Sequence, residues 1–356
     1  MNRRRVGRYL LEAWYDYQPE PFDPGAIRSA VIFMPKSIGD GMGIYPVIRA
    51  LQARGVEWLG IVASHRSAPV YEALKPEGVE VFEVSHDRDY RAVRGIAREI
   101  RRSRGQIDLC VEATTLISSP SIYFVGTLRA RMNLQLSGSR MKLYAPLCNQ
   151  HAAHYQEASP PQNWAWLMRD AGIAEVPGRF ELPVPAAVEN EVKPWLDDLL
   201  DNSGPYLVFN LDGSVRERQI SLAKAREMIP EIHRAQGLAI VIPFDPAGRA
   251  KAEALAEEFP YVHAYPGEPS ILRTAVMIKH ARLLISPNTA AIHIASAYDI
   301  PTLGLYHRLE PVWRPRASAN VVTLIKGPLA ELPLSQCMNA LDKLNQTLRN
   351  SPPKQA

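Results

Sequence analysis

The sequence has little cysteine and no long apolar run. Its 356 residues include three cysteines that lie far apart and form no CxxC pair: Cys110, Cys148 and Cys337. This spacing argues against a disulfide framework and a zinc site, and it fits a reducing compartment. No run of about 18 apolar residues occurs, so we expect no membrane-spanning helix. The residues after the basic start MNRRR are too polar for a signal-peptide core, so we expect a cytoplasmic protein.

Two ligand signatures are also missing. The glycines Gly39, Gly41 and Gly43 lack the spacing of a dinucleotide fingerprint, and no clear acidic residue ends the next predicted strand, at residues 58–63. We therefore expect no NAD site. The D-x-D pair formed by Asp87 and Asp89 stands at a predicted helix start, where capping aspartates are common, so we expect no metal there.

Positive charge is concentrated in the first half of the chain. The formal net charge is +4; residues 1–170 contain 22 Lys/Arg and 17 Asp/Glu (+5), whereas residues 171–356 contain 19 and 20 (−1). Either this excess is scattered surface charge, or the basic half meets an anionic partner. We expect no nucleic-acid partner.

The first residues predict a basic amphipathic helix. Apolar side chains recur at helical spacing, next to the arginines Arg3, Arg4, Arg5 and Arg8. The apolar members are Val6, Tyr9, Leu10, Ala13, Trp14 and Tyr17. Such a helix can lie on an anionic membrane surface, or it can pack against the protein's own core. The proline-rich residues 19–25 end it and lead stiffly into the first strand.

The remainder alternates between short apolar runs and helical segments. We predict strands at residues 30–34, 58–63, 79–84, 109–112, 122–125, 206–209, 239–243, 261–264, 283–286 and 302–306. A proline-rich stretch without regular pattern, residues 172–190, marks a domain boundary. The fold class is therefore α/β, with two doubly wound domains facing each other.

Polar turns follow several of these strands. Asp40 comes shortly after the strand at 30–34, where catalytic groups of open α/β sheets gather, although an aspartate there also suits a helix N-cap. Arg216 and Arg218 follow the strand at 206–209, and guanidinium groups pair well with a diphosphate.

Residues 283–306 predict a strand, a polar turn, a short helix and a second strand. Ser286-Pro287-Asn288-Thr289 break the first strand, and their side chains are typical of helix N-caps. The free backbone N–H groups of a helix start offer a site for phosphate. The helix predicted at 88–104 carries a second cationic feature, an arginine ridge that is either a solvated face or an anion-binding one: Arg91, Arg94, Arg98, Arg101 and Arg102.

Three segments resemble the motifs of glycosyltransferase family 9, the heptosyltransferases of lipopolysaccharide core assembly. Residues 36–51 (KSIGDGMGIYPVIRAL) are similar to its N-terminal motif, a G-D pair followed by P-x-x-x-x-L. Residues 286–302 resemble D-[ST]-G-x-x-H-x-A followed by P-T. Residues 210–227 resemble a third motif, in which a Lys or Arg ahead of a Trp-Pro pair binds the donor phosphates. The positions that match in the second motif are Thr289, His293, Ala295, Pro301 and Thr302.

This resemblance implies a GT-B fold, with two Rossmann-like domains facing a central cleft. It also implies metal-independent, inverting transfer of a heptose from ADP-heptose to the inner core, with Asp40 as general base and no further cofactor. The expected donor-binding residues are Arg216, Arg218, Asn288, Thr289, Ala290 and His293. An anionic acceptor, the lipopolysaccharide core or lipid A precursor, is expected to meet Lys36, Arg66, Arg94, Arg98 and Arg101.

The resemblance also assigns the domains. Residues 26–172 would bind the acceptor and residues 173–335 the nucleotide-sugar, between a basic helix with its linker at 1–25 and a C-terminal helix and tail at 336–356. We expect a protein of a Gram-negative bacterium that works at the cytoplasmic face of the inner membrane, with residues 1–25 open to peripheral contact with it.

Three departures from the family pattern leave alternatives open. Asn288 replaces the family's acidic residue, Ala290 its glycine, and Ile220-Ser221 its Trp-Pro pair. The donor is therefore less firmly implied than the reaction class. The protein could use another nucleotide-sugar, act as a nucleotide-sugar epimerase, or bind a nucleotide-sugar or the core without catalysis.

Overall fold

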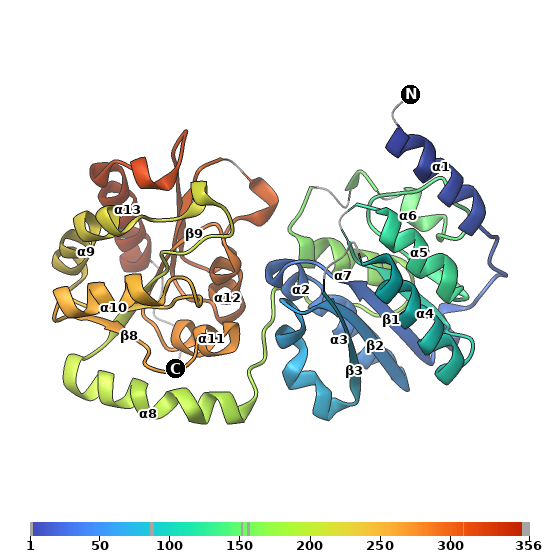
Figure 1. The fold of residues 1–356 in the computed structure, drawn as a ribbon, viewed down its shortest axis with the longest axis horizontal. Helices are drawn as coiled ribbons and strands as arrows, with labels where there is room; N and C mark the ends of the chain where they lie inside the picture. The colour runs from blue at the N-terminus through green and yellow to red at the C-terminus, as the bar shows by residue number, and fades with distance from the viewer. Residues whose placement is uncertain are drawn as a thin grey trace. The chain divides into compact units, whose positions relative to one another are not determined.

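The computed structural model describes residues 3–85, 89–114, 116–150, 152–154, 157–308 and 310–350, with side chains from residue 8 onward. Asp87 of the D-x-D pair lies outside these residues, and Asp89 caps a helix. The chain divides into two compact units, Met1–Phe180 and Glu181–Ala356, each built on a parallel sheet (Figure 1). The functional assignments of the domains remain predictions.

The sheet of the first unit has its strands in the order β3-β2-β1-β4-β5. They are β1 (Ser29–Met34), β2 (Trp58–Ser64), β3 (Val79–Val84), β4 (Leu109–Glu112) and β5 (Met132–Leu134). Residues 30–34 are all buried, as expected for a strand covered on both faces. The chain leaves β1 toward β2 and later returns to β4 on its other side, so the direction of the strand order reverses between β1 and β4.

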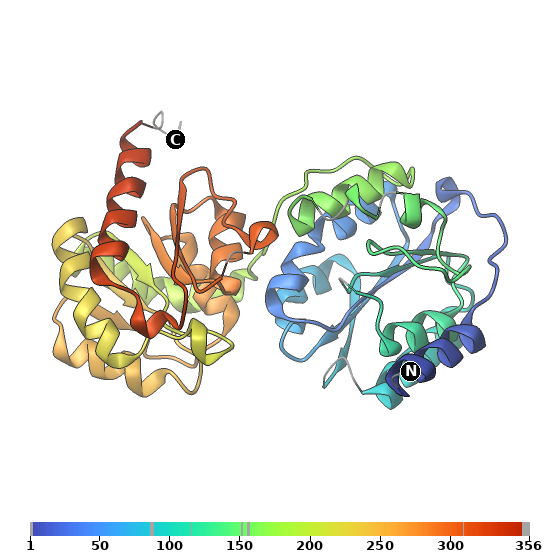
Figure 2. The same cartoon turned by 90° about the horizontal axis from the view of Figure 1, so that it is seen from above.

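Two groups of helices cover this sheet (Figures 1 and 2). The apolar sides of α4 (Tyr90–Arg104) and α5 (Ser119–Leu128) pack on Val31 and Phe33, and α1 (Arg3–Tyr15) lies against α5. On the other side α2 (Ile38–Gly43), α3 (Tyr45–Arg54) and α7 (Pro160–Asp170) lie together, and α6 (Leu147–Gln150) is a short turn.

The sheet of the second unit has the order β11-β10-β9-β6-β7-β8, which reverses between β6 and β9. Its strands are β6 (Tyr206–Phe209), β7 (Ala239–Ile242), β8 (Val262–Ala264), β9 (Leu284–Pro287), β10 (Thr302–Tyr306) and β11 (Asn320–Leu324). Its helices are α8 (Ala186–Ser203), α9 (Leu222–Gln236), α10 (Arg249–Glu258), α11 (Ile271–Lys279), α12 (Ala290–Tyr298) and α13 (Leu334–Asn350).

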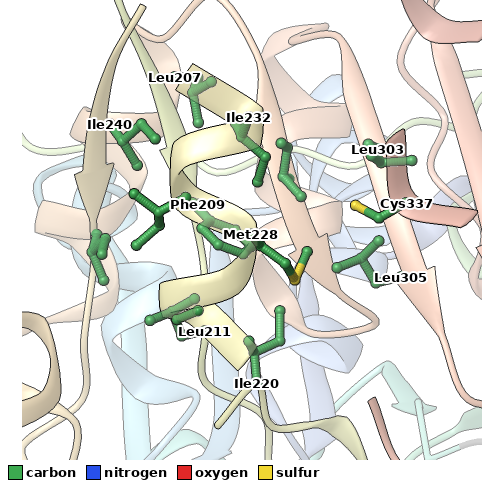
Figure 3. Packing of buried hydrophobic residues seen from close by; sticks show 14 of the residues in the cluster. Leu207, Phe209, Leu211, Ile220, Met228, Ile232, Ile240, Leu303, Leu305 and Cys337 are labelled. Carbon is green, nitrogen blue, oxygen red and sulfur yellow. The ribbon is translucent and has the colours of Figure 1, made fainter. Parts of the chain in front are cut away.

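The core of the second unit lies between its sheet and the apolar sides of α9, α10 and α13 (Figure 3). Met228 of α9 packs over Phe209, and Cys337 of α13 lies beside Leu303 and Leu305. Because this core fixes every strand, the loops at the strand ends are held in place and can carry side chains to defined positions.

The α/β fold class is confirmed, but one predicted strand is wrong. Residues 122–125 belong to α5, because Ser118 caps that helix and Pro120 suits its first turn. A short apolar run alone does not distinguish a buried strand from a buried helix. The sequence patterns also missed β5 and β11.

The described residues include no helix that is long and apolar enough to cross a membrane. The three cysteines are buried and unbridged.

Candidate functional site

Asp40 lies in α2, just beyond the carboxyl end of β1. It is the third residue of this short helix, and its carboxylate accepts hydrogen bonds from Ser37, at 3.2 Å from the backbone N and at short range from the hydroxyl. Close packing supports the turn, since a Cβ on Gly41 would come within 2.9 Å of the Tyr71 hydroxyl oxygen. Ser37 is therefore the N-cap, and Asp40, predicted as a possible N-cap, is instead the N3 residue of a capping box and remains half-exposed.

Lys36 and Arg66 lie at the same edge of the sheet as Asp40. Lys36 follows β1, and its carbonyl accepts a hydrogen bond of 2.7 Å from the hydroxyl of Ser64, the last residue of β2. Arg66 is exposed in the turn that Ser64 and Ser67 brace with hydrogen bonds between their side chains. The structure thus brings a carboxylate and two cations to the ends of two neighbouring strands.

The arginine ridge lies elsewhere on the first unit. Arg94, Arg98 and Arg101 are exposed along α4. At 1.5 Å per residue, Arg101 lies roughly 18 Å along the axis from the N-cap Asp89, and its guanidinium is 3.5 Å from the carbonyl of Thr127, near the end of α5. The ridge therefore runs from the carboxyl edge toward the opposite edge of the sheet, and only its start is near the strand ends.

Glu112 is a candidate that the sequence interpretation missed. It ends β4 opposite Phe33 of β1, at the point where the strand order reverses, and it is fully buried. Burial raises the pKa of Glu112 to about 7, although hydrogen bonds from Thr114 and the charge of Lys36 act in the opposite direction. The sequence does contain a sign of this residue, because Glu112 is an acidic residue directly at the end of an apolar strand, LCVE.

In the second unit, polar side chains meet where the strand order reverses between β6 and β9. Asn210, which follows β6, donates from Nδ2 to the hydroxyls of Ser286 at 3.0 Å and Thr289 at 3.1 Å. Thr289 caps α12 and accepts from the backbone N of Ala291 at 3.3 Å. The N-terminus of this helix therefore opens at the switch point of the sheet, the usual ligand position in such folds.

Arg218 and Asn288 join this site, and both contact Glu310. One Arg218 nitrogen, Nη1, donates to the Asn288 carbonyl at 3.0 Å, and the other, Nη2, lies 3.0 and 3.2 Å from the two Glu310 carboxylate oxygens. The same carboxylate accepts from the Asn288 side chain and from Arg308 Nε. A carboxylate has about four acceptor positions, and these contacts occupy those of Glu310. Glu310 was not predicted, because its partners at this site, Arg218 and Asn288, are 92 and 22 residues away in sequence.

The other predicted donor residues lie in different surroundings. Arg216 is exposed on the 3₁₀ turn Arg216–Arg218, and Ala290 is the half-exposed first residue of α12. His293 is buried, with its ring centroid 5.3 Å from that of Trp313. Burial lowers the pKa of His293 to about 3, with a further effect of Arg316, so its imidazole is neutral near pH 7. A neutral, buried histidine suits support of the turn rather than charge pairing with phosphate.

Comparison with known proteins decides the family. Residues 97–344 match the family described as glycosyltransferase family 9 (heptosyltransferase). The chain belongs to glycosyltransferase family 9. This match includes all six predicted donor residues but begins after Asp40, so the assignment of the base remains a prediction.

One curated relative is itself uncharacterized, and similar solved structures agree with this placement in fold. The uncharacterized protein YeeL of Escherichia coli (strain K12) is 34% identical over 231 residues, which cover 63% of this chain and 97% of YeeL. A family 9 glycosyl transferase from Veillonella parvula has a TM-score of 0.71 at 14% identity, covering 94% of this chain and 100% of that chain. The E. coli heptosyltransferase WaaC with ADP has a TM-score of 0.62 at 19% identity, covering 89% and 98%. These structures share the GT-B fold.

The free energy of unfolding of the wild type should fall as the pH rises, because Glu112 has a raised pKa. We predict that this fall is smaller in Glu112→Gln. Between the ordinary pKa of 4.5 and the folded value of about 7, only the unfolded state gives up this proton. The free energy of unfolding should therefore fall through this window by at most about 3 kcal/mol and no further above it. Urea unfolding at several pH values measures this effect. From pH 4.5 to pH 7, the free energy of unfolding of the wild type should fall progressively relative to that of the variant.

The exposed Glu99→Gln substitution on α4 is the matched control, and its curve should parallel that of the wild type. A Glu112→Gln curve that also runs parallel to the wild type would contradict the shifted pKa of Glu112.

Proposed function

We propose that this protein transfers a heptose from ADP-heptose to an anionic acceptor of the lipopolysaccharide inner core, with inversion and without a metal. Membership of family 9 supports sugar transfer. The observation that carries the donor assignment is the meeting of Arg218, Asn288 and the start of α12 at the switch point of the second sheet. The acceptor assignment rests on the family and on the basic first half of the chain.

The donor diphosphate would lie at the N-terminus of α12. There the backbone amides and the helix dipole favour negative charge, and Arg218 supplies a guanidinium. These groups would stabilise the charge that grows on the departing ADP, the part that a metal takes in other transferases. Arg216 would extend this cationic surface, Asn288 and Ala290 would line it, and His293 would brace the turn from inside.

At the acceptor, Asp40 would act as the general base. It would take the proton of the attacking hydroxyl while that oxygen forms a bond to the anomeric carbon and the bond from this carbon to the ADP oxygen breaks. Attack from the side opposite ADP inverts the anomeric centre. The Ser37 hydrogen bonds orient the Asp40 carboxylate, and Lys36 and Arg66 at the same edge would bind acceptor phosphates. Arg94, Arg98 and Arg101 would attract the acceptor over a longer range.

We predict that Asp40→Asn lowers turnover by about 10²–10⁴-fold, because the amide cannot accept the proton. ADP release and sugar incorporation are measured with ADP-heptose and a core acceptor, while ADP binding should stay unchanged. Asp23→Asn is the control, because Asp23 also caps a helical turn, through a 2.8 Å hydrogen bond from Gly25 N. Near wild-type turnover in a folded Asp40→Asn protein would refute the base assignment.

The same assay tests the alternatives. Donor consumption without acceptor would favour an epimerase, and ADP-heptose binding without turnover on any core acceptor would favour a binding protein.

We predict that Glu310→Gln increases ADP affinity about tenfold. In the structure the Glu310 carboxylate neutralises Arg218, so a diphosphate has to compete with it. The side chains of the pair are 19% and 15% exposed, so losing the charge should also lower the free energy of unfolding by about 1–3 kcal/mol. Calorimetric titration with ADP and urea unfolding measure the two effects.

Glu217→Gln, on the same 3₁₀ turn, is the control and should change neither quantity. Weaker ADP binding by Glu310→Gln would show instead that Glu310 holds Arg218 in its binding geometry.

A further inference from the structure

One side of α1 is fixed to the first unit. Leu11 and Tyr15 pack against its core, and the Tyr15 ring meets the Tyr123 ring of α5 edge to face at 5.2 Å. The contact with α5 is close, because a Cβ on Gly126 would come within 2.5 Å of Tyr15. Tyr17, just after the helix, donates a 2.8 Å hydrogen bond to the Ala130 carbonyl. The sequence left open whether this helix lies on a membrane or packs against the protein's own core. The side of α1 that carries Leu11 and Tyr15 packs against the core.

The opposite side of α1 presents large apolar groups to solvent. Trp14 is 83% exposed, Leu10 68% and Tyr9 58%. Leu10 and Trp14 are four residues apart and so are neighbours on the helix surface. The contacts with α5 leave these side chains without cover among the described residues, so helix packing does not explain them.

A basic groove borders this apolar strip. Its volume is about 1070 Å³, and its walls include Arg8 and Tyr9 of α1 and residues of the segment 137–149. Arg140 and Lys142 of that segment are exposed, whereas Arg8 is paired with Glu12 at 2.8 Å. Tyr9 belongs to both features, so the groove and the strip are continuous.

The arginine ridge lies on α4, which packs against α5 as α1 does. Tyr123 of α5, which contacts Tyr15, also meets the Tyr90 ring at the start of α4, with 5.4 Å between ring centroids. The helices α1 and α4 thus both contact α5, which lies between them (Figure 1). We call the combined area the α1–α4 surface, defined by Tyr9, Leu10, Trp14, Arg91, Arg94, Arg98, Arg140 and Lys142.

We propose that the α1–α4 surface binds a bilayer containing anionic phospholipid. Aromatic and leucine side chains insert at the boundary between headgroups and acyl chains, and arginine and lysine attract anionic headgroups. A soluble phosphate ligand would use the cations but leave Trp14 and Leu10 in water. Most of this surface precedes the family match at residues 97–344. It shares Arg94 and Arg98 with the proposed attraction of the acceptor, but binding to vesicles needs neither donor nor acceptor.

Vesicle flotation of the full-length protein tests this surface, with phosphatidylcholine vesicles that contain or lack phosphatidylglycerol. We expect binding only to the anionic vesicles. Leu10→Ser/Trp14→Ser and Arg94→Glu/Arg98→Glu should each weaken binding at least about tenfold. The substituted side chains are exposed, so the variants should fold. The matched controls Leu200→Ser on α8 and Arg226→Glu/Arg234→Glu on α9 should bind like the wild type.

Depth of insertion gives a second readout. Brominated lipid should quench tryptophan fluorescence in the wild type and much less in Trp14→Phe, which should still bind. Equal binding to neutral and anionic vesicles, or wild-type binding by both double variants, would overturn the proposal. It would also fail if inorganic phosphate displaced the protein while Leu10→Ser/Trp14→Ser still bound, because that result indicates a site for soluble anions.

Discussion

Burial of the central parallel strands on both faces determines where polar groups can lie in each unit. The central strands β1, β4, β6 and β7 are apolar except at their ends, so charged groups collect where these strands end. In each unit the strand order reverses once, between β1 and β4 and between β6 and β9. At these two places the neighbouring connections leave in opposite directions, and polar residues such as Glu112 and Asn210 gather at the strand ends even where they are buried.

The parts that the sequence predicted are those that this constraint determines locally. Apolar runs marked most strands, and Asp40, Arg218 and Thr289 were found because each follows such a run closely. Residues 122–125 were misassigned because a helix buried by α4 is as apolar as a strand. Glu310 could not be found, because its contacts with Arg218 and Asn288 join positions 92 and 22 residues away.

The charged groups in the two units show different balances between stability and ligand binding. Burial at the end of β4 disfavours the charged form of Glu112 and so raises its pKa. The Arg218–Glu310 pair neutralises a largely buried guanidinium in the free protein, and the same contact opposes an external anion. The buried His293 avoids the problem, since its lowered pKa keeps it neutral.

The most direct test of the account is mass spectrometry of core oligosaccharide from cells that have or lack the gene. We expect the core to lose one heptose unit without the gene, and the wild-type protein, but not Asp40→Asn at equal abundance, to restore it. An unchanged core in cells that lack the gene, or full restoration by Asp40→Asn, would contradict it.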